Sequence, residues 1–153
     1  GVKDSKKIIE KNRIILNEKI LEEAEYVSIK EVDVHTIDEI NILNATFLAM
    51  NRALENLNIS DKLVVVDGNK LIKQYKDKQE YLVKGDSKNL SIALASIIAK
   101  VTRDKMMYEY DKIYKEYGIA SHKGYGTKKH YEAIEKYGIL PIHRKTFLKK
   151  ILK

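Results

Sequence analysis

The feature that most constrains the fold is a short apolar run, Leu63-Val64-Val65-Val66, followed at once by Asp67-Gly68. Successive β-branched residues favour a strand, and the absence of polar alternation predicts that both faces of this strand are buried. Strands of this kind occur in parallel sheets that helices cover on both sides. Residues 26–32 and 81–83 indicate two further short strands. The sequence therefore predicts a sheet packed against helices.

Four helical patterns accompany these strands. Apolar side chains recur at helical spacing in residues 5–24, 37–57, 88–117 and 127–138. Thr36 and Glu39 have the spacing of a capping box, Thr127 is placed as an N-cap, Gly118 is placed to end the third helix, and Pro141 blocks continuation of the fourth. Helices alternating with strands predict an α/β fold. Three strands are few for such a fold, since a mean sheet has about 5–6.

Composition narrows the class of protein. The 153 residues suit one compact domain, with 44% hydrophobic and 33% charged residues. No apolar run approaches the roughly 20 residues of a membrane span and no signal peptide opens the chain, so we expect a cytoplasmic location. The absence of cysteine excludes disulfides and thiolate zinc sites. The net charge of +7, from 29 basic and 22 acidic residues, suits a nucleic-acid partner, although many basic proteins have none.

Two carboxylates stand in apolar surroundings. Asp67 follows the predicted buried strand, and the carboxyl ends of parallel strands point into the crevice where α/β proteins bind ligands. An Asp-Gly pair is also a common turn, so function and turn are equally good interpretations of Asp67 alone.

Asp104 lies on the apolar face of a helix. It shares one stripe, at spacings of three and four, with Leu90, Leu94, Ile97, Val101 and Tyr108. A buried carboxylate needs a partner. That partner is either a salt bridge or tyrosine hydroxyl from elsewhere in the fold, or a divalent cation shared with Asp67. Oxygen ligands without thiols favour Mg²⁺ or Mn²⁺ for such a site.

Several polar groups could contact a nucleic acid. The stretch SHKGYGT (residues 121–127) places His122, Lys123 and Tyr125 in a glycine-rich loop, where an aromatic ring can stack on a sugar or base. Lys6 and Lys7 in DSKK lie in the first turn of a predicted helix, where bound phosphate would offset their unfavourable interaction with the helix dipole. Ordinary solvated lysines are the simpler interpretation of that pair.

These segments together resemble the ribonuclease HII family. The resemblance runs collinearly from Gly1 to about Phe147 through DSKK (4–7), EINILNATFLAMNRAL (39–54), VVVDGNK (64–70), VKGDSKNLSIALASIIAKVTRDK (83–105), SHKGYGT (121–127) and PIHRKTF (141–147). Each motif is moderately specific, and six of them in this order are very specific.

The resemblance implies a ribonuclease H-like α/β fold with a mixed sheet flanked by helices. Residues 1–153 would form this domain, with 118–153 as a C-terminal helical substrate-binding part. It implies an endonuclease of DNA replication and repair that hydrolyses the phosphodiester 5′ of ribonucleotides, in RNA–DNA hybrids or in DNA duplexes with embedded ribonucleotides. The reaction would use water activated by Mg²⁺ or Mn²⁺.

Site residues follow from the same resemblance. Asp67 and Asp104 match two of the four acidic metal ligands, and Tyr125 matches the tyrosine that stacks on the sugar beside the scissile bond. Lys6 and Lys7 match a phosphate-contacting motif. Asn41 and Asn44 fall in a helix that faces the duplex.

One departure from the family is large. Its members begin with a strand that carries an Asp-Glu pair and a Gly-Arg-Gly turn, and neither motif occurs in these 153 residues. We therefore expect that the chain lacks the first two strands and is not a self-sufficient fold. The missing segment would be present as a separate, nicked or swapped chain, and the 153 residues alone would have negligible activity. An isolated monomer that melts cooperatively would contradict this expectation.

Two other functions are compatible with parts of the sequence. A non-catalytic basic module that binds duplexes would explain the charge without using the carboxylates. A phosphatase or another small-substrate metalloenzyme would explain Asp67 and Asp104, but it leaves the basic surface and Tyr125 without a role.

Overall fold

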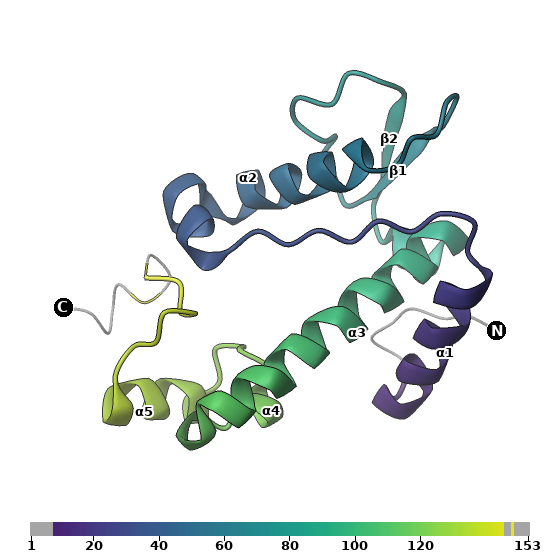
Figure 1. The fold of residues 1–153 in the computed structure, drawn as a ribbon. Helices are drawn as coiled ribbons and strands as arrows, with labels where there is room; N and C mark the ends of the chain where they lie inside the picture. The colour runs from purple at the N-terminus through teal and green to yellow at the C-terminus, as the bar shows by residue number, and fades with distance from the viewer. Residues whose placement is uncertain (1–7, 146–147, 149–153) are drawn as a thin grey trace. The chain divides into compact units, whose positions relative to one another are not determined.

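A computed structural model describes residues 8–145 and Leu148 (Figure 1). Its helices and strands, in chain order, are α1 (Glu10–Glu23), α2 (Val34–Glu55), β1 (Val64–Asp67), β2 (Gln79–Leu82), α3 (Leu90–Ile113), α4 (Ile119–His122) and α5 (Lys128–Tyr137). Two 3-10 turns, η2 (Gly85–Ser87) and η3 (Lys115–Tyr117), flank α3. The predicted α/β class and the four main helices are confirmed.

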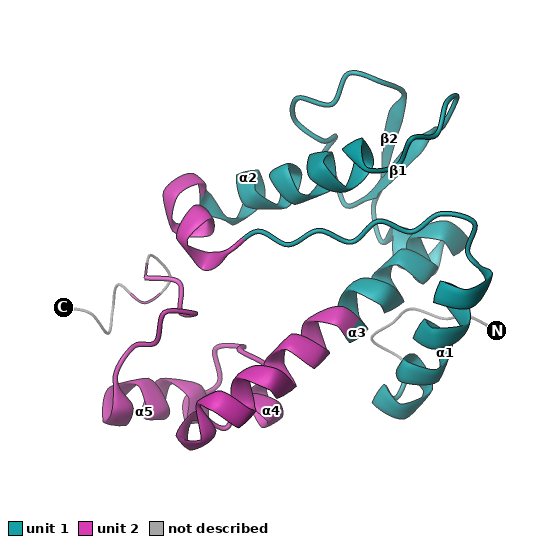
Figure 2. Ribbon diagram, in the orientation of Figure 1, with its two compact units in different colours: residues 1–32, 41–101 teal, residues 33–40, 102–153 magenta. Residues whose placement is uncertain are grey.

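The chain divides into two compact units (Figure 2). The first comprises residues 1–32 and 41–101, and the second comprises residues 33–40 and 102–153. Helices α2 and α3 each contribute residues to both units. Asp67 belongs to the first unit, whereas Asp104 and Tyr125 belong to the second.

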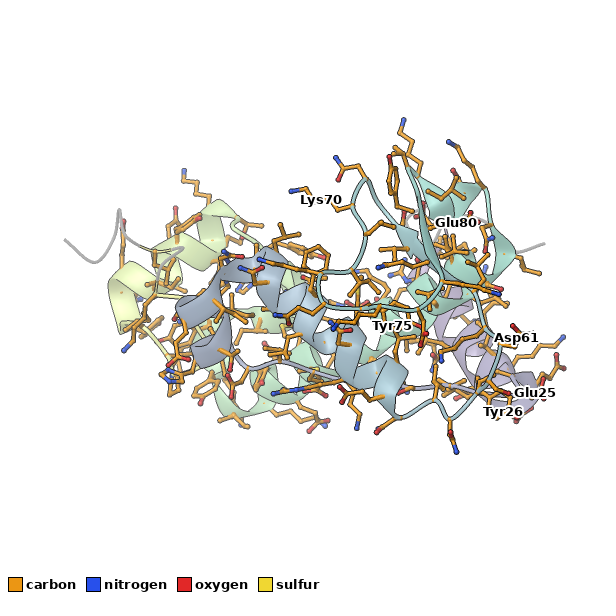
Figure 3. The ribbon with its side chains drawn as sticks, turned by 90° about the horizontal axis from the view of Figure 1, so that it is seen from above. Glu25, Tyr26, Asp61, Lys70, Tyr75 and Glu80 are labelled. Carbon is orange, nitrogen blue, oxygen red and sulfur yellow. The ribbon has the colours of Figure 1, made fainter. Side chains whose placement is uncertain are left out.

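The sheet of the first unit consists of β1 and β2, which pair in parallel with Val64 opposite Gln79 and Asp67 opposite Leu82. The side-chain amide of Gln79 closes the connecting loop. It accepts from the N–H of Ile72 at 2.7 Å and donates to the carbonyls of Ile72 and Tyr75, both at 3.1 Å. Figure 3 shows Tyr75 in this loop.

A small apolar core underlies this sheet. Its buried members are Phe47 from α2, Val66 from β1 and Ile72 from the loop. Val64 and Val65 are only partly buried, and Leu63 is exposed. The predicted strand is therefore confirmed, but its complete burial on both faces is not seen in this chain.

The strand predicted at residues 26–32 is absent from the structure, and that prediction was wrong. These residues form neither helix nor strand, and Tyr26 lies at the periphery of the first unit (Figure 3). Alternating residues set the directions of side chains, but a strand also needs a hydrogen-bonded neighbour. No segment within residues 8–145 provides that neighbour for Tyr26–Val32.

Helix α2 begins earlier than predicted and has a kink. Asp33, rather than Thr36, caps it, since the Asp33 carboxylate accepts from the N–H of Thr36 at 2.8 Å. Glu39 pairs with His35 at 3.1 Å instead of completing a capping box. Asn41 then interrupts the helix with φ +70°, and its side-chain oxygen accepts from the N–H of Asn44 at 3.0 Å. Asn41 thus restarts the helix as a second N-cap.

The second unit is built around α5 and the turns before it. Thr127 caps α5 as predicted, accepting from the N–H of His130 at 3.2 Å. Gly118 has φ +66°, a left-handed conformation that suits glycine at the end of a helical segment. The short helix α4 lies within the stretch that was predicted to be a loop. The buried apolar residues of this unit are Tyr117, Ile119, Ala133, Ile134 and Leu148.

Candidate active site

Asp67 is exposed at the carboxyl end of β1. Its Oδ1 atom accepts a hydrogen bond from the backbone N–H of Gly85 at 2.9 Å. A Cβ atom at Gly85 would lie 3.4 Å from this oxygen and 2.6 Å from Cδ1 of the buried Ile92, so glycine permits the close approach. The backbone turns directly after Asp67, at Gly68 with φ +136°. The carboxylate is therefore oriented by one backbone donor while it remains accessible.

Asp104 is buried on α3, with only 5% of its surface exposed. Val101 and Ile97, one and two turns before it, are also buried. Leu90 and Tyr108, at the two ends of the predicted stripe, are exposed, so the apolar stripe is confirmed in its middle part.

Lys123 supplies a positive charge beside this buried carboxylate. Its Nζ atom lies 4.0 Å from Oδ2 of Asp104, and the two side chains are 14% and 7% exposed. The same ammonium donates to the hydroxyl of Tyr108 at 2.7 Å and lies 4.0 Å from the centre of that ring. The structure thus shows the salt bridge that the sequence left open as one possible partner for Asp104.

Tyr125 projects from a tight loop that we call the tyrosine loop, residues 122–126. The ring is 54% exposed, and the guanidinium carbon of Arg103 lies 4.8 Å from its centre. Arg103 also donates to the carbonyl of Lys123 at 2.6 Å. Gly124 has φ +82°, and a Cβ atom there would lie 3.2 Å from Nη2 of Arg103. Arg103 therefore holds both the backbone and the aromatic ring of the loop.

The other predicted substrate residues have different surroundings. His122 is buried and its ring bonds backbone groups. Asn41 is exposed, and Asn44 is partly buried on the same helical segment. Lys6 and Lys7 lie outside the described residues.

Sequence reasoning missed two residues that shape the loop, Arg103 and His130. Arg103 lies next to Asp104 on α3, and its contacts with Lys123 and Tyr125 are with residues distant in the chain. His130 contacts the tyrosine loop from α5: its Nδ1 lies 2.9 Å from the carbonyl oxygen of Tyr125. The position of His130, three residues after the N-cap Thr127, does not predict this contact.

The donor set suits a hard cation. The two carboxylates offer oxygen ligands, and Asp67 is accessible, which fits Mg²⁺ or Mn²⁺ better than a thiophilic metal. Within residues 8–145, no three histidine, aspartate or glutamate side chains converge in a metal-binding cluster. Any metal held by Asp67 or Asp104 would therefore need further ligands. None of the helices in the described part of the chain is long and apolar enough to cross a membrane.

Comparison with known proteins identifies the family. A family model described as Ribonuclease HII matches residues 1–150. Ribonuclease HII of Clostridioides difficile is 57% identical over 152 residues, covering 99% of this chain and 59% of that protein. Ribonuclease HII of Caldicellulosiruptor bescii is 51% identical, covering 99% of this chain and 73% of that protein. The chain thus spans less than two thirds of the length of the Clostridioides protein.

A solved structure supports the same assignment. The crystal structure of ribonuclease H2 from Pyrococcus horikoshii matches with a TM-score of 0.78 and 28% sequence identity, covering 95% of this chain and 76% of that one. This likeness confirms the predicted ribonuclease H-like class of fold. The chain belongs to the ribonuclease HII family.

Proposed function

We propose that the full-length protein containing these residues is a divalent-metal-dependent endonuclease. It hydrolyses the phosphodiester 5′ of ribonucleotides in RNA–DNA hybrids, or in DNA duplexes with embedded ribonucleotides. The observation that carries the proposal is the accessible carboxylate of Asp67, held at a strand end by the N–H of Gly85 in a chain of the ribonuclease HII family. An accessible, pre-oriented carboxylate suits a metal ligand better than a turn residue with no further role.

Asp67 and Asp104 are the proposed metal ligands, and Mg²⁺ or Mn²⁺ is the proposed cofactor. When bound, the metal would supply activation of water and neutralise charge at the scissile phosphate. Asp104 is buried beside the Lys123 ammonium, whose Nζ lies 4.0 Å from Oδ2 and balances the charge of this carboxylate. Residues 1–153 contain two of the four acidic ligands implied by the family resemblance, so we propose that they have negligible activity alone.

The tyrosine loop would bind the substrate. The exposed ring of Tyr125 would stack on the sugar beside the scissile bond, and Arg103 would hold that ring in place. Discrimination of RNA from DNA would rest on the ribose 2′-hydroxyl. We propose residues 118–153 as the substrate-binding part of the domain, with further contacts from Lys6, Lys7, Asn41, Asn44, His122 and Lys123. His122 would act through the loop backbone, because its ring is buried.

The cellular setting follows from this substrate. Ribonucleotides within DNA arise during replication, so we propose a role in DNA replication and repair in the cytoplasm.

The second candidate is a non-catalytic duplex-binding module, which the net charge of +7 favours. Asp67→Asn and Asp104→Asn variants of the full-length protein distinguish the two candidate functions. Cleavage of a DNA duplex with one embedded ribonucleotide would be measured beside binding of the same duplex by fluorescence anisotropy.

If the protein is a nuclease, each variant should lose at least about 100-fold in kcat. Loss of even a group that only supports a metal ligand lowers metal affinity or activity by about 10–100-fold. The Kd for the duplex should change little. Asp61→Asn is the matched control, since Asp61 is 90% exposed and pairs with Lys78 on the surface. Unchanged cleavage in both variants would contradict the assignment of Asp67 and Asp104 as metal ligands, and absence of cleavage in the unsubstituted protein would favour the binding module.

A further inference from the structure

Three buried histidines from different segments form one connected cluster in the second unit. His122 ends α4, His130 lies in α5 and His143 follows Pro141, and each is less than 9% exposed. The rings of His122 and His130 stack with their centres 4.0 Å apart and their planes 12° apart. The Nε2 atoms of His130 and His143 lie 2.9 Å apart. We call these three residues the histidine cluster.

Backbone groups determine where each proton lies in this cluster. The N–H of Leu140 donates to Nδ1 of His143 at 2.8 Å, so the proton of His143 must be on Nε2. That Nε2–H donates to Nε2 of His130. His130 therefore carries its proton on Nδ1, which donates to the carbonyl of Tyr125 at 2.9 Å. One continuous chain of hydrogen bonds thus connects the backbone of Leu140 with the backbone of Tyr125.

The third histidine is the first residue of the tyrosine loop, and its ring bonds backbone groups within and before the loop. The N–H of Gly124 donates to Nδ1 of His122 at 3.0 Å, and Nε2–H of His122 donates to the carbonyl of Tyr117 at 2.8 Å. Gly124 N–H and Tyr125 C=O, two neighbouring backbone groups of the tyrosine loop, are therefore both bonded by imidazoles. This directional pairing requires one tautomer of each ring.

His130 and His143 are suited to a neutral state. Burial is the main reason that the pKa of His143 is lowered to about 4, with smaller contributions from His130 and His122. Burial also lowers the pKa of His130. A proton added to Nε2 of His130 would face the Nε2–H of His143 and break the chain of hydrogen bonds.

Orientation of Tyr125 depends on its backbone. An exposed ring is not fixed by packing, so its direction follows from the loop conformation and from Arg103. We propose that His130 and His143 are positioning residues, which orient Tyr125 toward substrate through the hydrogen bond to its carbonyl group. This inference rests on the proposed substrate-binding role of Tyr125.

The test compares two replacements of His130 in the full-length protein. Asparagine places an amide N–H near the position of Nδ1 and can still donate to Tyr125, whereas leucine fills the space without a donor. Cleavage of a duplex with one embedded ribonucleotide gives kcat and KM, and thermal melting confirms that each variant is folded. His35→Leu is the control, because His35 is exposed in the same unit.

We expect His130→Leu to lower kcat about tenfold with little change in KM, because small misplacement of a positioning group is costly. His130→Asn should stay within about threefold of the unsubstituted protein. In a Tyr125→Ala background, His130→Leu should add no further loss, since both changes remove the same interaction. Equal effects of leucine and asparagine, or additive losses in the double variant, would overturn the inference.

The two proposals fail in different ways. If Tyr125→Ala alone leaves cleavage unchanged, the proposed role of Tyr125 is wrong and the positioning role falls with it. If Tyr125→Ala impairs cleavage but His130→Leu does not, only the positioning role is wrong.

A measurement on the unsubstituted protein covers the case in which His130→Leu does not fold. Long-range ¹H–¹⁵N spectra of the imidazoles at pH 7 should show Nδ1–H for His130 and Nε2–H for His143. The opposite tautomer of either ring would overturn the inference.

Discussion

The surroundings of Asp67 and Asp104 differ although the two side chains are chemically identical. Asp67 is exposed at a strand end and receives one backbone hydrogen bond, from Gly85. Asp104 is buried in a helix and lies 4.0 Å from the ammonium of Lys123. The first carboxylate is stabilised mainly by water, and the second by a charge that the protein supplies.

This difference shows two ways in which a fold can accommodate a carboxylate. An exposed carboxylate needs only orientation, because solvent stabilises its charge. A buried carboxylate needs a partner within the protein, since an isolated charge in the interior costs several kcal/mol. Lys123 fills that need in this structure. Four substitutions or conditions should reduce stability by amounts that decrease from the buried ion pair to the exposed carboxylate.

The largest effect should come from Lys123→Met, which leaves Asp104 buried beside an apolar side chain. We expect the free energy of unfolding to fall by roughly 3 kcal/mol, the cost of removing one partner of a buried pair. Urea denaturation of the full-length protein measures it. Lys128→Met is the matched control: Lys128 lies 3.9 Å from Glu132, but these side chains are 91% and 60% exposed. The control should lose less than about 0.5 kcal/mol, and similar losses in both variants would contradict the comparison.

The second effect is a loss of stability in acid that comes from the second unit. The pKa of His143 is lowered from 6.5 to about 4, so between these values the unfolded chain binds a proton that the native protein does not. Stability should therefore fall as the pH drops from about 6.5 to about 4, by on the order of 2–3 kcal/mol. His130, also with a lowered pKa, adds to the same trend.

Urea midpoints at several pH values measure this effect. His143→Gln should reduce the pH dependence between these limits, whereas His35→Gln should leave it unchanged because His35 is exposed. A pH dependence that survives His143→Gln in full would show that other groups are responsible.

Arg103→Lys should have an intermediate effect, confined to the tyrosine loop. Lysine keeps the charge but loses the planar group that lies over Tyr125 and bonds the carbonyl of Lys123. We expect a loss of about 1 kcal/mol in stability, together with weaker cleavage. Lys136→Ala provides the comparison, since Lys136 lies 5.2 Å from the centre of the exposed Tyr137 ring. A larger loss of stability in Lys136→Ala would refute the assigned role of Arg103.

The smallest effect on stability should come from Asp67→Asn, despite its large expected effect on cleavage. The amide oxygen of asparagine can still accept from Gly85 N–H, and the side chain is exposed. We expect a change below about 0.5 kcal/mol. Asp104→Asn should cost more, because it removes the buried negative charge 4.0 Å from the ammonium of Lys123. Thermal melts of both variants measure this difference. A larger loss of stability in Asp67→Asn than in Asp104→Asn would contradict the comparison.

Local sequence signals predicted much of the secondary structure. The β-branched run before Asp67 became β1, and Thr127 caps α5, because both signals act through neighbouring residues. The prediction of a strand at residues 26–32 was wrong because a strand must pair with another segment. The alternating pattern of residues carries no information about such a partner. At the start of α2, Asp33 replaced Thr36 as the cap because an aspartate three residues earlier bonds the Thr36 N–H.

The sequence was sufficient for statements that depend on residue type and order. It placed Asp67 at a strand end and Asp104 on an apolar helix face, and six collinear motifs indicated the family. These features depend on neighbouring residues in the chain, so they do not require knowledge of how distant segments pack together.

Contacts between residues that are distant in the chain could be identified only from the folded structure. Lys123 meets Asp104 from beyond the end of α3, and His143 meets His130 from beyond the end of α5. Such pairings depend on the directions of the connecting turns, including the left-handed Lys123 and Gly124. Long-range geometry of this kind arises from packing, and no short stretch of sequence specifies it.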